Sequence, residues 1–127
     1  METILIVDDD DDFRMLCERE LQFTGYATRS MSSGKDALLF VADHPEVKLI
    51  VLDIQMFPLD GIQVLEELRA KKINLPVILY SDYPLYKNDF KSWLADAFLV
   101  KSSDLSELKR TARELLVPRK VESQDSG

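Results

Sequence analysis

The residues of this sequence that could do chemistry stand directly after short apolar runs. The set, with the preceding run of each member in parentheses, comprises Asp8 and Asp9 (4–7), Asp53 (49–52), Ser81 (77–80) and Lys101 (98–100). If the runs are parallel strands of one sheet, their carboxyl ends meet at one edge, and ligands bind outside that edge. Three carboxylates, one hydroxyl and one ammonium group are therefore expected to converge there.

These groups suit a phosphoryl group bound together with a divalent cation. Clustered carboxylates repel one another, which raises their pKa values unless a cation neutralises them. Oxygen ligands suit Mg²⁺, which proteins hold through one or two carboxylates, waters and phosphate oxygens. Lys101 would bind an anionic oxygen as a point charge, and the Ser81 hydroxyl can donate to another. Asp53 is the expected covalent acceptor, because it follows the central strand, between the acidic pair and the lysine.

Parts of this set also have ordinary structural interpretations. Residues 10–12 continue the aspartate row, and carboxylates at a helix start are stabilised by the helix dipole. The row is not an EF-hand loop, since position six, counted from Asp8, is Phe13 rather than glycine and position twelve is Arg19 rather than glutamate. The lysine or the serine alone would be an ordinary strand-end residue. Their joint placement indicates a site.

Other catalytic chemistry has little support in the sequence. The only histidine, His44, precedes Pro45 near the end of an expected helix, so neither a histidine triad nor a zinc site can be built. The first apolar run leads into aspartates rather than a glycine-rich loop, which excludes a nucleotide phosphate loop.

Composition limits the classes of protein further. The chain has 127 residues, of which 46% are hydrophobic and 31% charged, with a formal net charge of −7. This length fits one domain, and the apolar fraction excludes a disordered chain. The acidic balance argues against direct nucleic-acid binding and against docking on anionic membranes. A single cysteine, no signal peptide and no run of the ~18 apolar residues of a membrane span predict a cytoplasmic protein.

The chemistry-bearing residues require an alternating arrangement of strands and helices to position them. Strands are expected at residues 3–7, 26–28, 49–52, 77–80 and 98–100, the second being an exposed edge strand. Helical periodicity follows each strand, with an N-cap at Ser33, a C-terminal stop at Gly25 and the weakest pattern at residues 86–94. This alternation predicts an α/β fold, a doubly wound five-stranded parallel sheet covered by helices on both faces. Residues 1–117 form the expected domain, and residues 118–127 a disordered tail or linker stub.

The ordered set of residues resembles the receiver domain of response regulators, as in a stand-alone chemotaxis response regulator, over about residues 3–116. It consists of Asp8-Asp9 after residues 4–7, Leu52-Asp53 with Asp60-Gly61 seven and eight residues on, then Ser81 and Lys101. The resemblance implies a flavodoxin-like (βα)5 three-layer sandwich with strand order 2-1-3-4-5.

The resemblance also implies a role for each matching residue. Asp53 is the phosphoacceptor, Asp9 a direct Mg²⁺ ligand, and Asp8 the acid that holds the metal through water. The backbone carbonyl of Gln55 is the third protein ligand. Ser81 and Lys101 bind the phosphoryl group. Phe98 takes the aromatic switch position.

The implied activity is two-component signal transduction. A sensor histidine kinase or a phosphotransfer protein donates a phosphoryl group from phosphohistidine to Asp53, which later loses it by hydrolysis. While Asp53 carries the phosphate, Ser81 moves toward it and Phe98 repacks. This changes contacts with a downstream protein through the face of the fourth helix, fifth strand and fifth helix. The domain catalyses only these reactions on itself, and is a monomer or a phosphorylation-dependent homodimer.

Four departures from the family pattern keep alternatives open. Phe57 stands where proline usually follows Met56, Asp82 where a small residue is common, and Ser102 where proline follows Lys101 in a cis bond; that bond is trans or a strained cis. Phe98 lacks the hydroxyl of the common tyrosine. A non-phosphorylated pseudo-receiver that binds protein partners is therefore the first alternative. A phosphohydrolase is less favoured, because Gln55 stands where a second acid is needed.

Overall fold

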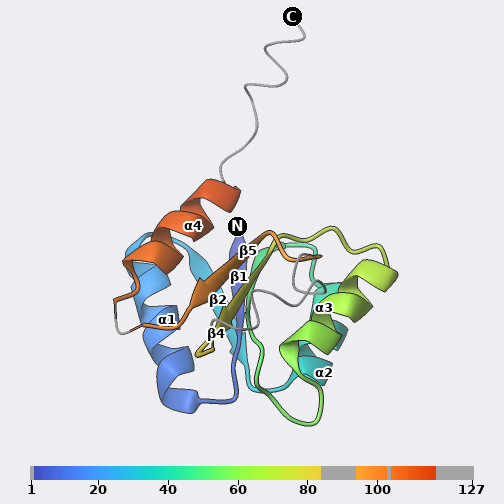
Figure 1. Cartoon of the computed structure of the whole chain (residues 1–127). Coiled ribbons are helices and arrows are strands. Elements are labelled where there is room, and N and C mark those ends of the chain that lie inside the picture. The colour runs from blue at the N-terminus through green and yellow to red at the C-terminus, as the bar shows by residue number, and fades with distance from the viewer. Residues whose placement is uncertain (1, 84–93, 103, 117–127) are drawn as a thin grey trace, which may run out of the picture.

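The computed structural model describes residues 2–83, 94–102 and 104–116 as alternating strands and helices (Figure 1). Their bounds are β1 Thr3–Val7, α1 Asp11–Phe23, β2 Ala27–Met31, α2 Gly34–Asp43, β3 Val47–Asp53, α3 Gly61–Ala70, β4 Val77–Ser81, β5 Ala97–Val100 and α4 Ser106–Leu116. Of the helix expected at 86–94, only Leu94 lies within the described residues, and the expected tail at 118–127 lies outside them.

The strands form one parallel sheet in the order β2-β1-β3-β4-β5, which confirms the predicted fold class and strand order. Each strand overlaps its expected apolar run. The strand expected at 26–28 is β2, and its side chains are partly exposed because it lies at the edge of the sheet. The central strand β3 is longer than its continuous apolar run and ends on Asp53.

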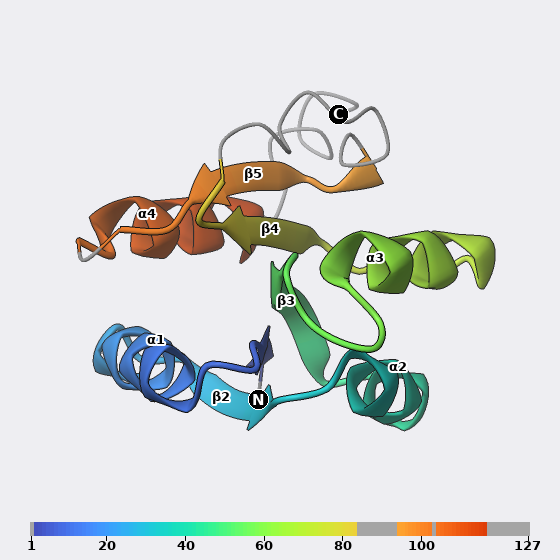
Figure 2. The same ribbon diagram turned by 60° about the horizontal axis from the view of Figure 1, so that its bottom comes forward.

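Two helical layers cover the two faces of the sheet (Figure 2). The alternation of side chains along each strand divides the core between them. On β1, Ile4 and Ile6 join the cluster that includes Cys17 of α1 and Leu108 of α4. Leu5 and Val7 point to the other face, where α2 and α3 pack. Burial on both faces explains why the central strands read as continuous apolar runs.

Polar caps fix the helices that begin at the carboxyl edge of the sheet. Asp10 is the N-cap of α1 and accepts a hydrogen bond from the Phe13 amide, while Asp11 and Asp12 lie in the first turn. The last three aspartates of the row therefore lie at the start of a helix, as their position in the sequence predicts. The expected N-cap Ser33 accepts from the Asp36 amide at the start of α2.

The start of α3 packs directly on the end of β3. Gly61 donates its amide hydrogen to the carbonyl oxygen of Ile54 at 2.8 Å. A Cβ at position 61 would clash with the carbonyl oxygen of Asp53 and lie 2.9 Å from the Ile54 Cα. Glycine at this position therefore allows α3 to approach the backbone that carries Asp53.

We expect Gly61→Ala to lower the free energy of unfolding by about 1 to 3 kcal/mol, because backbone rather than a flexible side chain must move to accept the methyl group. Glu67→Ala, at an exposed position of α3, is the control and should change stability by less than about 0.5 kcal/mol. Urea unfolding of both variants measures the difference. Equal stability of the two variants would contradict the packing argument.

Candidate functional site

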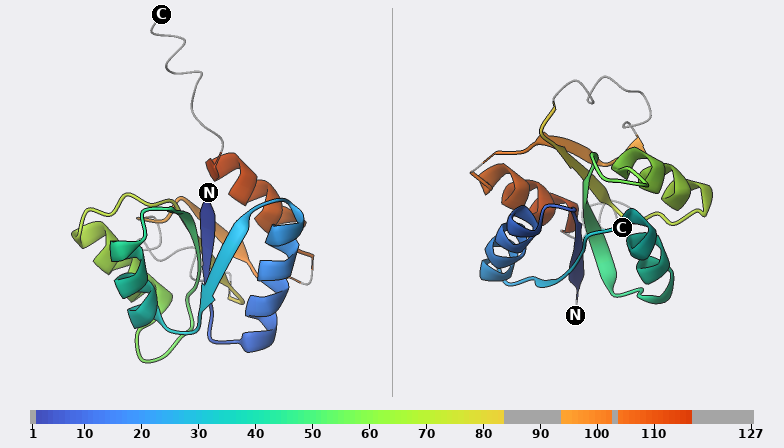
Figure 3. Two further views of the ribbon diagram at one scale, coloured as in Figure 1. Left: turned by 180° about the vertical axis from the view of Figure 1, so that it is seen from behind. Right: turned by 90° about the horizontal axis from the view of Figure 1, so that it is seen from below.

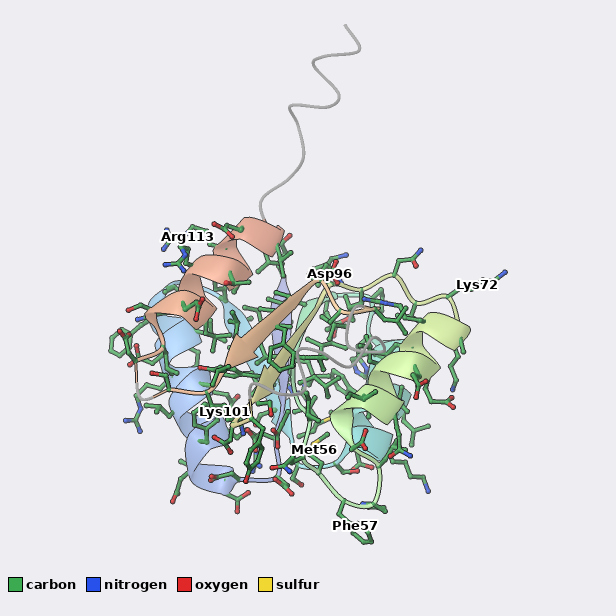
Figure 4. All side chains as sticks on the ribbon, viewed as in Figure 1. Met56, Phe57, Lys72, Asp96, Lys101 and Arg113 are labelled. Atoms are coloured by element: carbon green, nitrogen blue, oxygen red, sulfur yellow. The ribbon has the colours of Figure 1, made fainter. Side chains whose placement is uncertain are left out.

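The carboxyl ends of the strands bring the predicted residues together at one edge of the sheet, seen from below in Figure 3. Figure 4 shows Lys101, Met56 and Phe57 toward this edge, and Lys72 and Arg113 toward the opposite one. Because parallel pairing aligns the strand ends, residues separated by more than 90 positions in sequence meet here, as the hydrogen bond from Lys101 to Asp8 shows.

Lys101 forms ion pairs with two buried carboxylates. Its Nζ lies 2.8 Å from Oδ2 of Asp8 and 3.2 Å from Oδ1 of Asp53. Asp8 is 3% exposed and Asp53 is 5% exposed. Ion pairs in such surroundings are poorly screened by solvent, so removing the lysine would leave two buried carboxylates without compensation.

Asp9 completes a group of carboxylates that could hold a metal ion. Oxygen atoms of Asp8, Asp9 and Asp53 all lie within 4.8 Å of one another. Asp9 is exposed, and it lines a cavity of about 350 Å³ together with Gln55 of the loop after β3. A donor set of oxygen atoms only, open to solvent on one side, fits a hard cation such as Mg²⁺.

Ser81 and Phe98 lie on the two strands beyond Asp53. Ser81 is fully buried at the end of β4, and its Oγ accepts a hydrogen bond from the Tyr83 amide at 3.0 Å. Its carbonyl oxygen accepts from the Lys101 amide at 2.7 Å, which ties the ends of β4 and β5 together. Phe98 is partly buried and packs against the core cluster on the α2 and α3 side.

Burial dominates the electrostatics of the site. Burial, reinforced by the charge of Asp8, raises the pKa of Asp53 to about 6, and Lys101 opposes this shift without cancelling it. Burial lowers the pKa of Lys101, but its hydrogen bonds and ion pairs with the carboxylates outweigh that effect and raise it above the ordinary value. Burial and the charge of Asp8 raise the pKa of Cys17 to about 12, so this thiol stays protonated and is no candidate nucleophile.

Two residues that support the site were not identified from the sequence. The ammonium of Lys101 lies 4.7 Å from the ring centroid of Phe13, which is the geometry of a cation–π contact. Arg14 donates from Nη1 to the carbonyl oxygen of Asp8 at 2.6 Å. In the sequence, Phe13 resembles an ordinary apolar residue of a helix face. Arg14 could not be recognised from the sequence, because the group that it contacts is a backbone carbonyl.

The departures from the family pattern surround the site. Within the described residues the one cis peptide bond is Phe57–Pro58, so the Lys101–Ser102 bond is trans. Phe57 is 88% exposed. Asp82 is exposed and lines, with Lys101 and Ser102, a second cavity of about 430 Å³.

The fold and the gathered side chains define the receiver class of α/β domains, in which acids, a serine and a lysine meet at the carboxyl edge of a doubly wound sheet. Residues 4–113 match the response regulator receiver domain family. The chain therefore belongs to this family, as a receiver domain of the two-component response regulators.

Solved and curated relatives agree with this assignment. The response regulator TrrA of Thermotoga maritima, crystallised in complex with Mg²⁺-BeF, is 38% identical with a TM-score of 0.85, covering 91% of this chain and 100% of that one. The regulatory protein AtoC of Escherichia coli is 35% identical over 124 residues, which are 95% of this chain and 25% of AtoC. The response regulator MprA of Mycobacterium ulcerans is 34% identical, covering 98% of this chain and 54% of MprA.

This chain thus spans between a quarter and about half of the length of these two curated relatives. Among the helices of the described residues, none has the length and apolar character that a membrane span requires.

The pKa of Asp53 predicts how the stability of the metal-free protein depends on pH. Because the pKa is higher in the folded state, about 6 against an ordinary value of 3.8, the folded protein binds more protons than the unfolded chain between these values. The free energy of unfolding should therefore fall as pH rises from about 4 to 7. Asp53→Asn should remove this dependence and stabilise the protein at pH 7 by about 1 to 3 kcal/mol.

Denaturant unfolding at several pH values in metal-free buffer measures this effect. Asp12→Asn, at an exposed position of the aspartate row, is the control because it makes the same change in net charge. A pH dependence that is identical in the wild type and in Asp53→Asn would refute the assignment of the effect to Asp53.

Proposed function

We propose that this receiver domain accepts a phosphoryl group on Asp53 from the phosphohistidine of a sensor histidine kinase or phosphotransfer protein, with Mg²⁺ as the cofactor. The observation that carries the proposal is the position of the Asp53 carboxylate. It lies 3.2 Å from the ammonium of Lys101 and within a group of three carboxylates that suits a cation.

The residues divide the work of phosphoryl transfer. Asp8, Asp9, Asp53 and the backbone carbonyl of Gln55 would hold Mg²⁺, which supplies positive charge to the carboxylates and the phosphoryl oxygens. An oxygen of Asp53 forms the new bond to phosphorus. The bond from phosphorus to the imidazole nitrogen of the donor breaks, and its electron pair stays on that nitrogen. Lys101 binds a phosphoryl oxygen as a point charge, because its ammonium already lies against Asp53.

The signal leaves the site through Ser81 and Phe98. The Ser81 hydroxyl can donate to a phosphoryl oxygen while it still accepts from the Tyr83 amide. Phe98, on β5 and thus two strands from Asp53 on β3, is only partly buried and can repack. We propose that this change alters contacts with a downstream protein or with a second copy of the chain, and that hydrolysis of the aspartyl phosphate reverses it.

A relative supports a histidine kinase as the donor. TrrA has been crystallised in complex with the histidine kinase ThkA, and TrrA in that complex is 38% identical to this chain, covers 92% of it and has a TM-score of 0.85. By analogy, this receiver would bind a kinase or a phosphotransfer protein in the cytoplasm. It would catalyse only its own phosphorylation and dephosphorylation.

A non-phosphorylated pseudo-receiver is the second candidate. It is favoured by Asp82, whose exposed carboxylate shares a cavity with Lys101 and would repel an incoming phosphoryl group. Such a domain would bind its protein partners in one fixed state. The two candidates differ in a single measurable property, the Mg²⁺-dependent modification of Asp53.

Incubation with Mg²⁺ and acetyl phosphate should add the mass of one phosphoryl group to the wild-type protein and none to Asp53→Asn, because the variant lacks the nucleophilic oxygen. Intact-protein mass spectrometry measures the gain. Asp12→Asn, which keeps the site, should be modified like the wild type. Omission of Mg²⁺ should abolish the gain, because the clustered carboxylates then repel the phosphoryl oxygens.

A wild-type protein that neither gains mass nor binds beryllofluoride in the presence of Mg²⁺ would overturn the proposed function in favour of the pseudo-receiver. Sustained release of phosphate from several phosphomonoesters would instead indicate a phosphohydrolase.

A further inference from the structure

Arg14, in the first turn of α1, reaches back across the turn that connects β1 to α1. Its side chain is 16% exposed. Nη1 donates to the carbonyl oxygen of Asp8 at 2.6 Å, and Nη2 pairs with Oδ1 of Asp11 at 2.7 Å. The guanidinium thus joins the end of the first strand to the start of the first helix.

The hydrogen bond from Arg14 is one of four contacts, all within the described residues, that hold Asp8 in place. The Asp8 amide donates to the carbonyl oxygen of Met31 at 3.1 Å. Its Oδ1 accepts from the Asp10 amide at 2.9 Å, and its Oδ2 pairs with Lys101. With Arg14 on the carbonyl oxygen, the amide, the carbonyl and both carboxylate oxygens of Asp8 are bonded.

The same bond also orients the next residue. The carbonyl of Asp8 belongs to the planar peptide unit that links it to Asp9, so holding this oxygen fixes the plane of that unit. Asp9 is exposed and forms the open side of the carboxylate group. The direction in which its side chain leaves the backbone therefore depends on the bond made by Arg14.

The charge of Arg14 and its hydrogen bond to Asp8 should have opposite effects on cation binding. A guanidinium near a cation site repels the cation, so removing its charge should strengthen cation binding if charge were its main effect. Its ion pair with Asp11 is a weak reason for its placement, since the Asp11 side chain is 75% exposed. The short bond to a buried residue is the stronger contact.

We propose that Arg14 is a positioning residue for the divalent cation: it holds the Asp8–Asp9 peptide so that both carboxylates face the ion together with Asp53. The inference rests on the proposed function, because it assumes that the group of three carboxylates binds Mg²⁺. Loss of the hydrogen bond from Arg14 to the Asp8 carbonyl oxygen weakens cation binding, even though the substitution also removes a charge that repels the cation.

The test compares two substitutions that remove the same charge from the same helix. Isothermal titration calorimetry of Mg²⁺ binding should show a dissociation constant about tenfold weaker for Arg14→Met, the lower end of the ten- to hundredfold loss typical when a residue that orients metal ligands is removed. Arg19→Met, at an exposed position, should bind Mg²⁺ as the wild type does or slightly more tightly. Arg14→Lys keeps a positively charged nitrogen that can donate to the Asp8 carbonyl, and should recover part of the loss.

Urea unfolding in metal-free buffer shows whether each variant is folded, and only folded variants enter the comparison. Should Arg14→Met fail to fold, the comparison of Arg14→Lys with Arg19→Lys replaces it, with a smaller loss expected for the former. Mg²⁺ binding to Arg14→Met as tight as to the wild type, or tighter, overturns the inference and leaves the proposed function standing. A wild-type protein that does not bind Mg²⁺ overturns the proposed function itself.

Discussion

Asp8 and Asp53 are buried beside each other, and one ammonium group, that of Lys101, pairs with both. Two carboxylates separated by less than 4.8 Å repel each other by roughly 3 to 4 kcal/mol at an effective dielectric constant of about 20. A charge-assisted hydrogen bond contributes about 1.5 to 3 kcal/mol. Lys101 therefore offsets much of the repulsion but leaves the desolvation of the carboxylates uncompensated. The raised pKa of Asp53 expresses this residual cost.

The backbone around the two buried aspartates is tightly packed. The strands that carry Asp8 and Asp53 are neighbours in the middle of the sheet and are covered on both faces. The start of α3 packs on the backbone of Asp53 through Gly61, without space for a side chain. The backbone positions of the two aspartates are therefore held by the packing around them, and a nearby cation or a proton can relieve the repulsion between their carboxylates.

The sequence was sufficient to predict this edge of the sheet because the relevant signals are local. Continuous apolar runs mark the central strands, and the residue that follows each run must lie at the carboxyl edge, as Asp53 and Lys101 do. The supporting contacts could not be predicted in the same way. Arg14 bonds to a backbone oxygen, and the cation–π contact of Phe13 depends on the path of a strand nearly 90 residues away. The trans bond after Lys101 was likewise undecided until the backbone was placed.

The present partners of Lys101 suggest how phosphorylation would change the domain. Its ammonium now lies between Asp8 and Asp53 and over the ring of Phe13. Under the proposed function, a cation takes over the neutralisation of the carboxylates, and the phosphoryl group offers Lys101 an anionic oxygen in place of the Asp53 carboxylate. The Lys101 amide is bonded to the carbonyl oxygen of Ser81, so a movement of this lysine would act on the ends of β4 and β5 together. Under the proposed function, the exchange of ion-pair partners at Lys101 would thereby connect the chemistry at Asp53 to the strand that carries Phe98.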